Sequence, residues 1–80
     1  MSDPEEAIKA RIKKDIDLFY VSIGSVGEIQ DSKAISKIVE LSRMYAEDSK
    51  SFLEKGDLYT AFASINYAHG LLDAVIAIKK

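Results

Sequence analysis

The sequence predicts an all-α fold, an antiparallel up-and-down three-helix bundle that forms a single domain over residues 1–80. Apolar residues recur every three or four positions over three long stretches, as they do on the buried face of a helix. Gly, Asp and Ser gather between the stretches, where turns are expected. The expected helices, at residues about 4–23, 32–55 and 57–79, have similar lengths and can therefore pack side by side.

The first helix should begin at Asp3 and Pro4, because Asp caps helices and Pro suits the first helical position. Glu6 is placed to complete a capping box. The buried stripe is expected to be Ile8, Ile12, Ile16, Phe19 and Ile23. On the charged side, the pairs spaced i,i+4 are Glu5–Lys9, Arg11–Asp15 and Lys13–Asp17. The run Gly24-Ser25-Val26-Gly27 should end the helix and begin a flexible connector.

The second helix, which Asp31 or Ser32 can cap, has small residues in the middle of its predicted inner face. Small residues there would let a neighbouring helix approach closely. This face is expected to consist of Ile35, Ile38, Val39, Ser42, Ala46, Ser49 and Leu53. The run Lys55-Gly56-Asp57 then predicts a sharp reversal, in which Gly takes the left-handed position and Asp caps the third helix.

The third helix is apolar on more than one side, and Asp73 is the only formal charge between positions 58 and 78. It is about long enough to cross a bilayer, but its polar residues favour a core helix and no membrane contact. The inner face is expected to be Leu58, Ala61, Ile65, Ala68, Leu72, Val75 and Ile76. A second apolar row consists of Tyr67, Leu71, Ala74 and Ile78. This row is core if the first helix covers it and an interface if it does not.

Residues 45–74, YAEDSKSFLEKGDLYTAFASINYAHGLLDA, resemble an archaeal family of small helical proteins described as domain of unknown function 357. The blocks FLEKGD at 52–57 and YAHGLLDA at 67–74 carry the resemblance. It implies a closed three-helix bundle in an archaeal cytoplasm, and it supplies no activity.

A weaker resemblance, to one tetratricopeptide unit, rests on Gly56-Asp57-Leu58, Ala61-Phe62 and Ala68. No 34-residue period recurs, so it does not indicate a repeat array. Microtubule-interacting-and-trafficking domains also look like a lone repeat and bind peptide helices, which keeps a binding role open by analogy.

Charge and composition narrow the function classes. The net charge of −2 gives no general attraction to nucleic acid, which is therefore disfavoured as a partner. A basic cluster on the first helix could still contact RNA phosphates, but the acidic residues around it favour a solvated face. This cluster consists of Lys9, Arg11, Lys13 and Lys14. The acidic, polar start lacks the pattern of a secretory signal, so we expect a cytoplasmic protein.

One polar strip could carry chemistry, because Asn66, His69 and Asp73 fall on adjacent lines of the third helix. A structural pair is the favoured explanation of the strip, and the chain has no Cys and no G-x-S-x-G nucleophile motif. The Glu-x-x-His spacing of di-iron bundles is also absent. We therefore expect no enzyme, no catalytic residue, no metal and no cofactor.

The sequence thus predicts a non-catalytic helical interaction module. It would self-associate as a homodimer or bind a partner protein, in either case through Tyr67, Leu71, Ala74 and Ile78. The alternatives are a nucleic-acid accessory protein that uses the basic cluster, and a small-ligand site or enzyme at His69 and Asp73.

Overall fold

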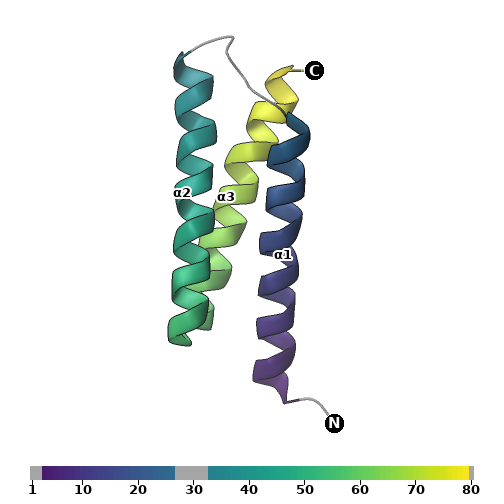
Figure 1. The fold of residues 1–80 in the computed structure, drawn as a ribbon, viewed down its shortest axis with the longest axis vertical. Coiled ribbons are helices and arrows are strands. Elements are labelled where there is room, and N and C mark those ends of the chain that lie inside the picture. Colours follow the sequence, from purple (N-terminus) through teal and green to yellow (C-terminus); the bar gives the residue numbers. More distant parts are fainter. Residues whose placement is uncertain (1–2, 27–32, 80) are drawn as a thin grey trace.

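A computed structural model describes residues 3–26 and 33–79 of the chain, which form three helices and no strand. Helix α1 spans Pro4–Val26, α2 spans Lys33–Lys55 and α3 spans Leu58–Lys79. The chain runs up through α1, down through α2 and up again through α3 (Figure 1). The all-α three-helix bundle predicted from the sequence is confirmed.

Both ends of α1 differ from the sequence-based expectation. The Asp3 carboxylate caps α1 by accepting the Glu5 amide at 3.0 Å, but the Glu6 carboxylate lies 3.7 Å from Lys9 and forms no capping box.

At its carboxyl end, α1 continues past the expected end at Ile23 to Val26. Ile23 and Val26 both pack against the core. This packing offsets the roughly 1 kcal/mol that a helical Gly24 costs. The expected connector at 24–27 is therefore wrong for residues 24–26, while Gly27 and the candidate caps Asp31 and Ser32 lie outside the described residues.

The reversal between α2 and α3 is the tight turn that the sequence predicts. Gly56 has φ +83°, in the left-handed region that favours glycine. The Asp57 amide donates to the Phe52 carbonyl at 2.9 Å and the Gly56 amide to the Leu53 carbonyl at 3.1 Å, as in a Schellman motif. The Asp57 carboxylate then accepts the Thr60 amide at 3.1 Å and caps α3. One short run therefore ends α2, reverses the chain and starts α3.

The core is built on a seam between α2 and α3, the helix pair with the most extensive contact. Ser42, Ala46 and Ser49 of α2 are fully buried, as are Ala61 and Ala68 of α3. The Ser49 hydroxyl donates to the Ala61 carbonyl across the seam at 2.7 Å, and the Ser42 hydroxyl donates to the Val39 carbonyl within α2, also at 2.7 Å. Small side chains therefore let the two helices approach closely, and their polar atoms are satisfied.

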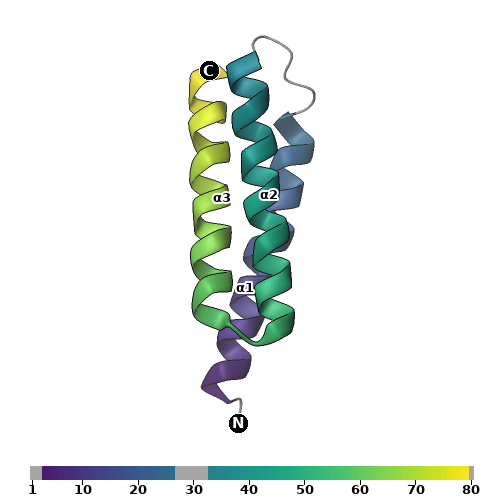
Figure 2. The same cartoon turned by 90° about the vertical axis from the view of Figure 1, so that its left-hand side faces the viewer.

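Helix α1 packs against one side of the α2–α3 hairpin, and it contacts α3 more than α2. Its residues Ile12, Ile16 and Phe19 are buried as predicted. Ile8, expected in the same stripe, is 47% exposed. Its assignment to the core is wrong, because Ile8 lines an open hollow beside the start of α3. The first turns of α1 extend beyond the α2–α3 turn (Figure 2), so this end of α1 is only partly covered.

The close seam predicts a strong effect of side-chain size at Ala46. Ala46→Leu should lower the free energy of unfolding by about 1–3 kcal/mol, since the added atoms must push α2 and α3 apart. Urea unfolding followed by circular dichroism measures the change. Ala10→Leu adds the same atoms at an exposed position of α1 and should change stability by no more than about 0.5 kcal/mol. Equal effects of the two substitutions would contradict the close seam.

Candidate functional site

The second apolar row of α3, hereafter the distal row, consists of Tyr67, Leu71, Ala74 and Ile78. Tyr67 is 55% exposed and Ile78 63% exposed, while Leu71 is half-buried and Ala74 is exposed. The row flanks α2, since the Tyr67 ring lies 4.6 Å from the ring of Tyr45. Leu41 of α2 adds another partly exposed apolar side chain. Helix α1 does not cover the distal row, which faces solvent in the single chain.

The residues of the polar strip do not converge on one point. His69 Nε2 lies 2.8 Å from the backbone carbonyl oxygen of Asp15 in α1. A carbonyl only accepts hydrogen bonds, so Nε2 is assigned as the donor. The His69 ring also meets the Phe19 ring edge-on at 5.7 Å. Asn66 and Asp73 are exposed, and no bond joins His69 to Asp73 in the described part of the chain. His69 therefore ties α3 to α1.

The basic cluster is divided between different surfaces of α1. Arg11 pairs with the Asp15 carboxylate at 3.3 Å, as the i,i+4 spacing predicts. Lys9 and Lys13 instead lie beside α2, and Lys14 is exposed. Lys9 pairs with Glu6 at 3.7 Å and not with Glu5 as expected. No pair joins Lys13 to Asp17 within residues 3–26 and 33–79. The four cations therefore do not form one phosphate-binding surface.

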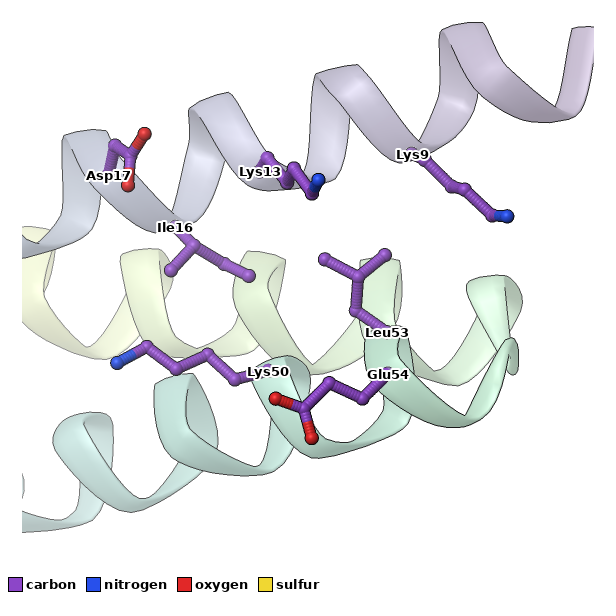
Figure 3. A pocket seen from close by; sticks show the side chains of 7 residues that line it. All are labelled: Lys9, Lys13, Ile16, Asp17, Lys50, Leu53 and Glu54. Carbon is purple, nitrogen blue, oxygen red and sulfur yellow. The ribbon is translucent and has the colours of Figure 1, made fainter.

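A groove that the sequence reasoning missed lies between α1 and α2 (Figure 3). This α1–α2 groove is open to solvent, has a volume of about 560 Å³ and is lined by Lys9, Lys13, Ile16, Asp17, Lys50, Leu53 and Glu54. Ile16 and Leu53 form an apolar floor, Lys9 reaches into the space from α1, and Lys13 lies along the underside of α1 (Figure 3). The sequence places these residues on two helix flanks, but the width of the gap depends on how the helices pack.

A polar cross-link joins α1 to α2 beside this groove. The Tyr20 hydroxyl donates to Glu47 Oε1 at 2.5 Å, and Lys50 Nζ lies 3.7 Å from the same carboxylate and 4.4 Å from the centre of the Tyr20 ring. Burial, and then the bond to Glu47, raises the pKa of Tyr20 above 10.0. The bond from Tyr20, and then the charge of Lys50, lowers the pKa of Glu47 below 4.5. The hydrogen bond with Tyr20 raises the pKa of Lys50 above 10.5.

A second hollow, of about 490 Å³, lies where the exposed start of α1 passes the start of α3. Its lining is almost entirely apolar and consists of Ala7, Ile8, Arg11, Leu58, Tyr59 and Phe62. Periodicity does not reveal this hollow, because it assigns Ile8 and Leu58 to the core. No signal in the sequence gives the stagger of α1 along the bundle, which exposes Ile8.

Two further features bear on function. Within residues 3–26 and 33–79, no group of three His, Asp or Glu side chains is arranged to hold a metal ion. Leu58–Ile78 is, in that part of the chain, the one helix long and apolar enough to cross a membrane. Length and composition alone give this result, and core helices of soluble proteins also meet these criteria.

The fold and its surfaces define a small helical bundle with open apolar faces and no converging set of reactive groups among the described residues. The family described as Protein of unknown function (DUF357) matches residues 21–80, and the chain belongs to that family. This match confirms the resemblance seen in the sequence. It covers α2, α3 and the end of α1, so Lys9, Lys13 and Asp15 lie outside it. No curated protein matches the chain.

The Tyr20–Glu47–Lys50 cross-link predicts a stability contribution that depends on pH. Because the pKa of Glu47 is lowered, its contribution is complete above 4.5 and is lost as the pH falls through the folded-state pKa. Because the pKa values of Tyr20 and Lys50 are raised, their contributions are complete below about 10 and are lost at higher pH.

Tyr20→Phe removes the hydroxyl and should lower stability near neutral pH by about 0.5 kcal/mol, a small value because the carboxylate is exposed. The difference from the parent should shrink toward about pH 3 and about pH 11. Urea unfolding across this range measures it. Asp48→Asn changes an exposed carboxylate elsewhere on α2 and serves as the control. A difference that stays constant with pH would contradict the cross-link.

A structural role for His69 predicts unequal effects along the polar strip. His69→Ala should destabilise the fold by about 1–2 kcal/mol, because it removes a partly buried hydrogen bond and a ring contact. Asp73→Ala should change stability by no more than about 0.5 kcal/mol, since Asp73 is exposed. Chemical unfolding at one pH compares the two. A larger loss for Asp73→Ala would show that the carboxylate, and not the Asp15 carbonyl, is the main partner of His69.

Proposed function

We propose that the protein is a non-catalytic interaction module that binds a second helical surface through α3. That surface belongs either to a second copy of the chain or to a partner protein. The observation that carries the proposal is the open distal row, in which Tyr67 and Ile78 remain more than half exposed. Contiguous exposed apolar side chains of this kind are typical of interfaces.

The geometry of the hairpin supports this proposal. A pair of packed helices has two open faces. Helix α1 covers one face of the α2–α3 pair and leaves the other open (Figure 1). A fourth helix laid on the other face would remove Leu41, Tyr67 and Ile78 from water, at about 25 cal/mol per Å² of apolar surface buried. The distal row contains no charged residue, so the matching surface should be apolar as well.

A second copy of the chain is a simple candidate for that surface. In a two-fold dimer each distal row would face its own copy, and an uncharged row meets itself without like-charge repulsion. An 80-residue domain also gains from such pairing, because it buries a smaller share of its surface than a larger domain does. We include an archaeal cytoplasm in the proposal, on the family resemblance alone.

The alternative functions receive less support from the geometry. Division of the basic cluster leaves Lys9 and Lys13 apart from Arg11, which pairs with Asp15. His69 bonds to backbone and not to Asp73, an arrangement that a structural residue explains. Salt-sensitive binding of RNA to the wild-type chain, lost in Lys13→Glu, would favour the nucleic-acid role instead.

Charge placed in the distal row should abolish association. Tyr67→Asp and Ile78→Asp should convert the associated form to a folded monomer, seen by analytical ultracentrifugation with circular dichroism as the check on folding. These positions are better probes than half-buried Leu71, whose replacement by Asp risks unfolding the chain. Asn66→Asp adds the same charge at an exposed position of α3 that faces away from the row, so it is the matched control and should associate normally.

If the wild-type chain is a monomer at high concentration, self-association is wrong and the partner protein remains. A pull-down from nuclease-treated cell extract then compares the wild type with Ile78→Asp. A protein captured by both forms equally would contradict binding through the distal row.

A further inference from the structure

The α1–α2 groove combines an apolar floor with a positive end, and it lies on a different flank of α2 from the distal row. Its volume of about 560 Å³ is within the range of clefts that bind ligands, about 300–1,000 Å³. Ile16 is buried beneath it at 5% exposure, and half-buried Leu53 points into the space from α2 (Figure 3). The floor can therefore receive a large apolar side chain.

The charges at the rim are unevenly placed. Lys9 extends from α1 into the groove and Lys13 lines it along the underside of α1, while the Glu54 carboxylate stays along α2 and the Asp17 carboxylate beside α1 (Figure 3). Lys9 has an exposed pair with Glu6 at 3.7 Å, an interaction worth little in water. Lys13 has no ion-pair partner among the described residues. The end of the groove nearer the start of α1 is therefore positive and available.

The other end of the groove is already neutralised. Lys50 lies 3.7 Å from Glu47 and 4.4 Å from the Tyr20 ring centre, so its charge is engaged within the protein. The bond from Tyr20 to Glu47 also fixes the spacing of α1 and α2 beside the groove. The groove consequently has apolar contact near Ile16 and Leu53 at its floor, and at one end the ammonium group of Lys13 and that of Lys9, whose one ion pair, with Glu6, is exposed.

We infer that the α1–α2 groove is a second docking site, for a short acidic amphipathic segment of a partner protein. Such a segment places one large apolar side chain on the floor and a carboxylate within a helical turn of it, against Lys9 and Lys13. A free phosphate would match the lysines but leave Ile16 and Leu53 unused. The groove is therefore complementary to a segment that carries both a large apolar side chain and a carboxylate.

The test selects binders from a library of short random peptides displayed on phage, using the wild-type chain as bait. Enriched sequences should pair Leu, Ile or Phe with Asp or Glu within four residues. The best peptide is then synthesised with a fluorophore, and its Kd is measured by anisotropy. Lys9→Glu with Lys13→Glu should weaken binding by at least about tenfold, and Lys13→Arg should preserve it. Lys37→Glu, an exposed charge reversal elsewhere on α2, is the matched control.

Several results would overturn the docking site. They are the enrichment of no peptide, the enrichment of basic or neutral peptides, and equal affinity for the wild type and the double variant. Retained affinity when the peptide's apolar residue becomes Ala, together with displacement by inorganic phosphate, would indicate a simple anion site and would also overturn it. Ile78→Asp should bind the peptide with unchanged affinity. The docking site and the distal-row interface can therefore be refuted separately.

Discussion

The close contact between α2 and α3 is the constraint on which the other features depend. Ser42, Ala46 and Ser49 bring the two helices together because they have no long side chains, and the Ser49 hydroxyl finds its acceptor in the Ala61 carbonyl. A seam of small residues buries little apolar volume by itself. The hairpin therefore needs large side chains on its faces, and α1 supplies Ile12 and Phe19 to one of them. The other face keeps its apolar residues in solvent.

The three helix pairs differ in how tightly they are joined. In the described residues, a side-chain hydrogen bond links each pair: Ser49 to Ala61 within the buried seam, His69 to Asp15 at partial burial, and Tyr20 to Glu47 at the exposed surface. Contact decreases in the same order, from α2–α3 through α1–α3 to α1–α2. The α1–α2 groove lies between the pair in least contact. The groove and the distal row thus both follow from α1 packing mainly against α3.

Local signals in the sequence were enough to predict the helices, the Gly56 turn and the inner faces of α2 and α3, since each depends on residues close together in the chain. Three features could not be predicted in this way. Val26 extends α1 through tertiary packing, Ile8 is exposed by the stagger of α1, and the α1–α2 groove depends on the spacing of two helices. The residues of the distal row were identified, but their exposure depends on which face α1 covers, and periodicity does not contain that information.

The face that α1 covers is itself informative. Helix α1 packs on the flank of α3 that carries His69, and Tyr67 and Ile78 stay outside this contact. In this arrangement the partly buried His69 imidazole has a hydrogen-bond partner, the Asp15 carbonyl. The chain places the polar His69 side chain in an intramolecular contact and leaves Tyr67 and Ile78 more than half exposed, which departs from the local rule that apolar side chains belong inside. Such departures concentrate where a surface is kept for another molecule.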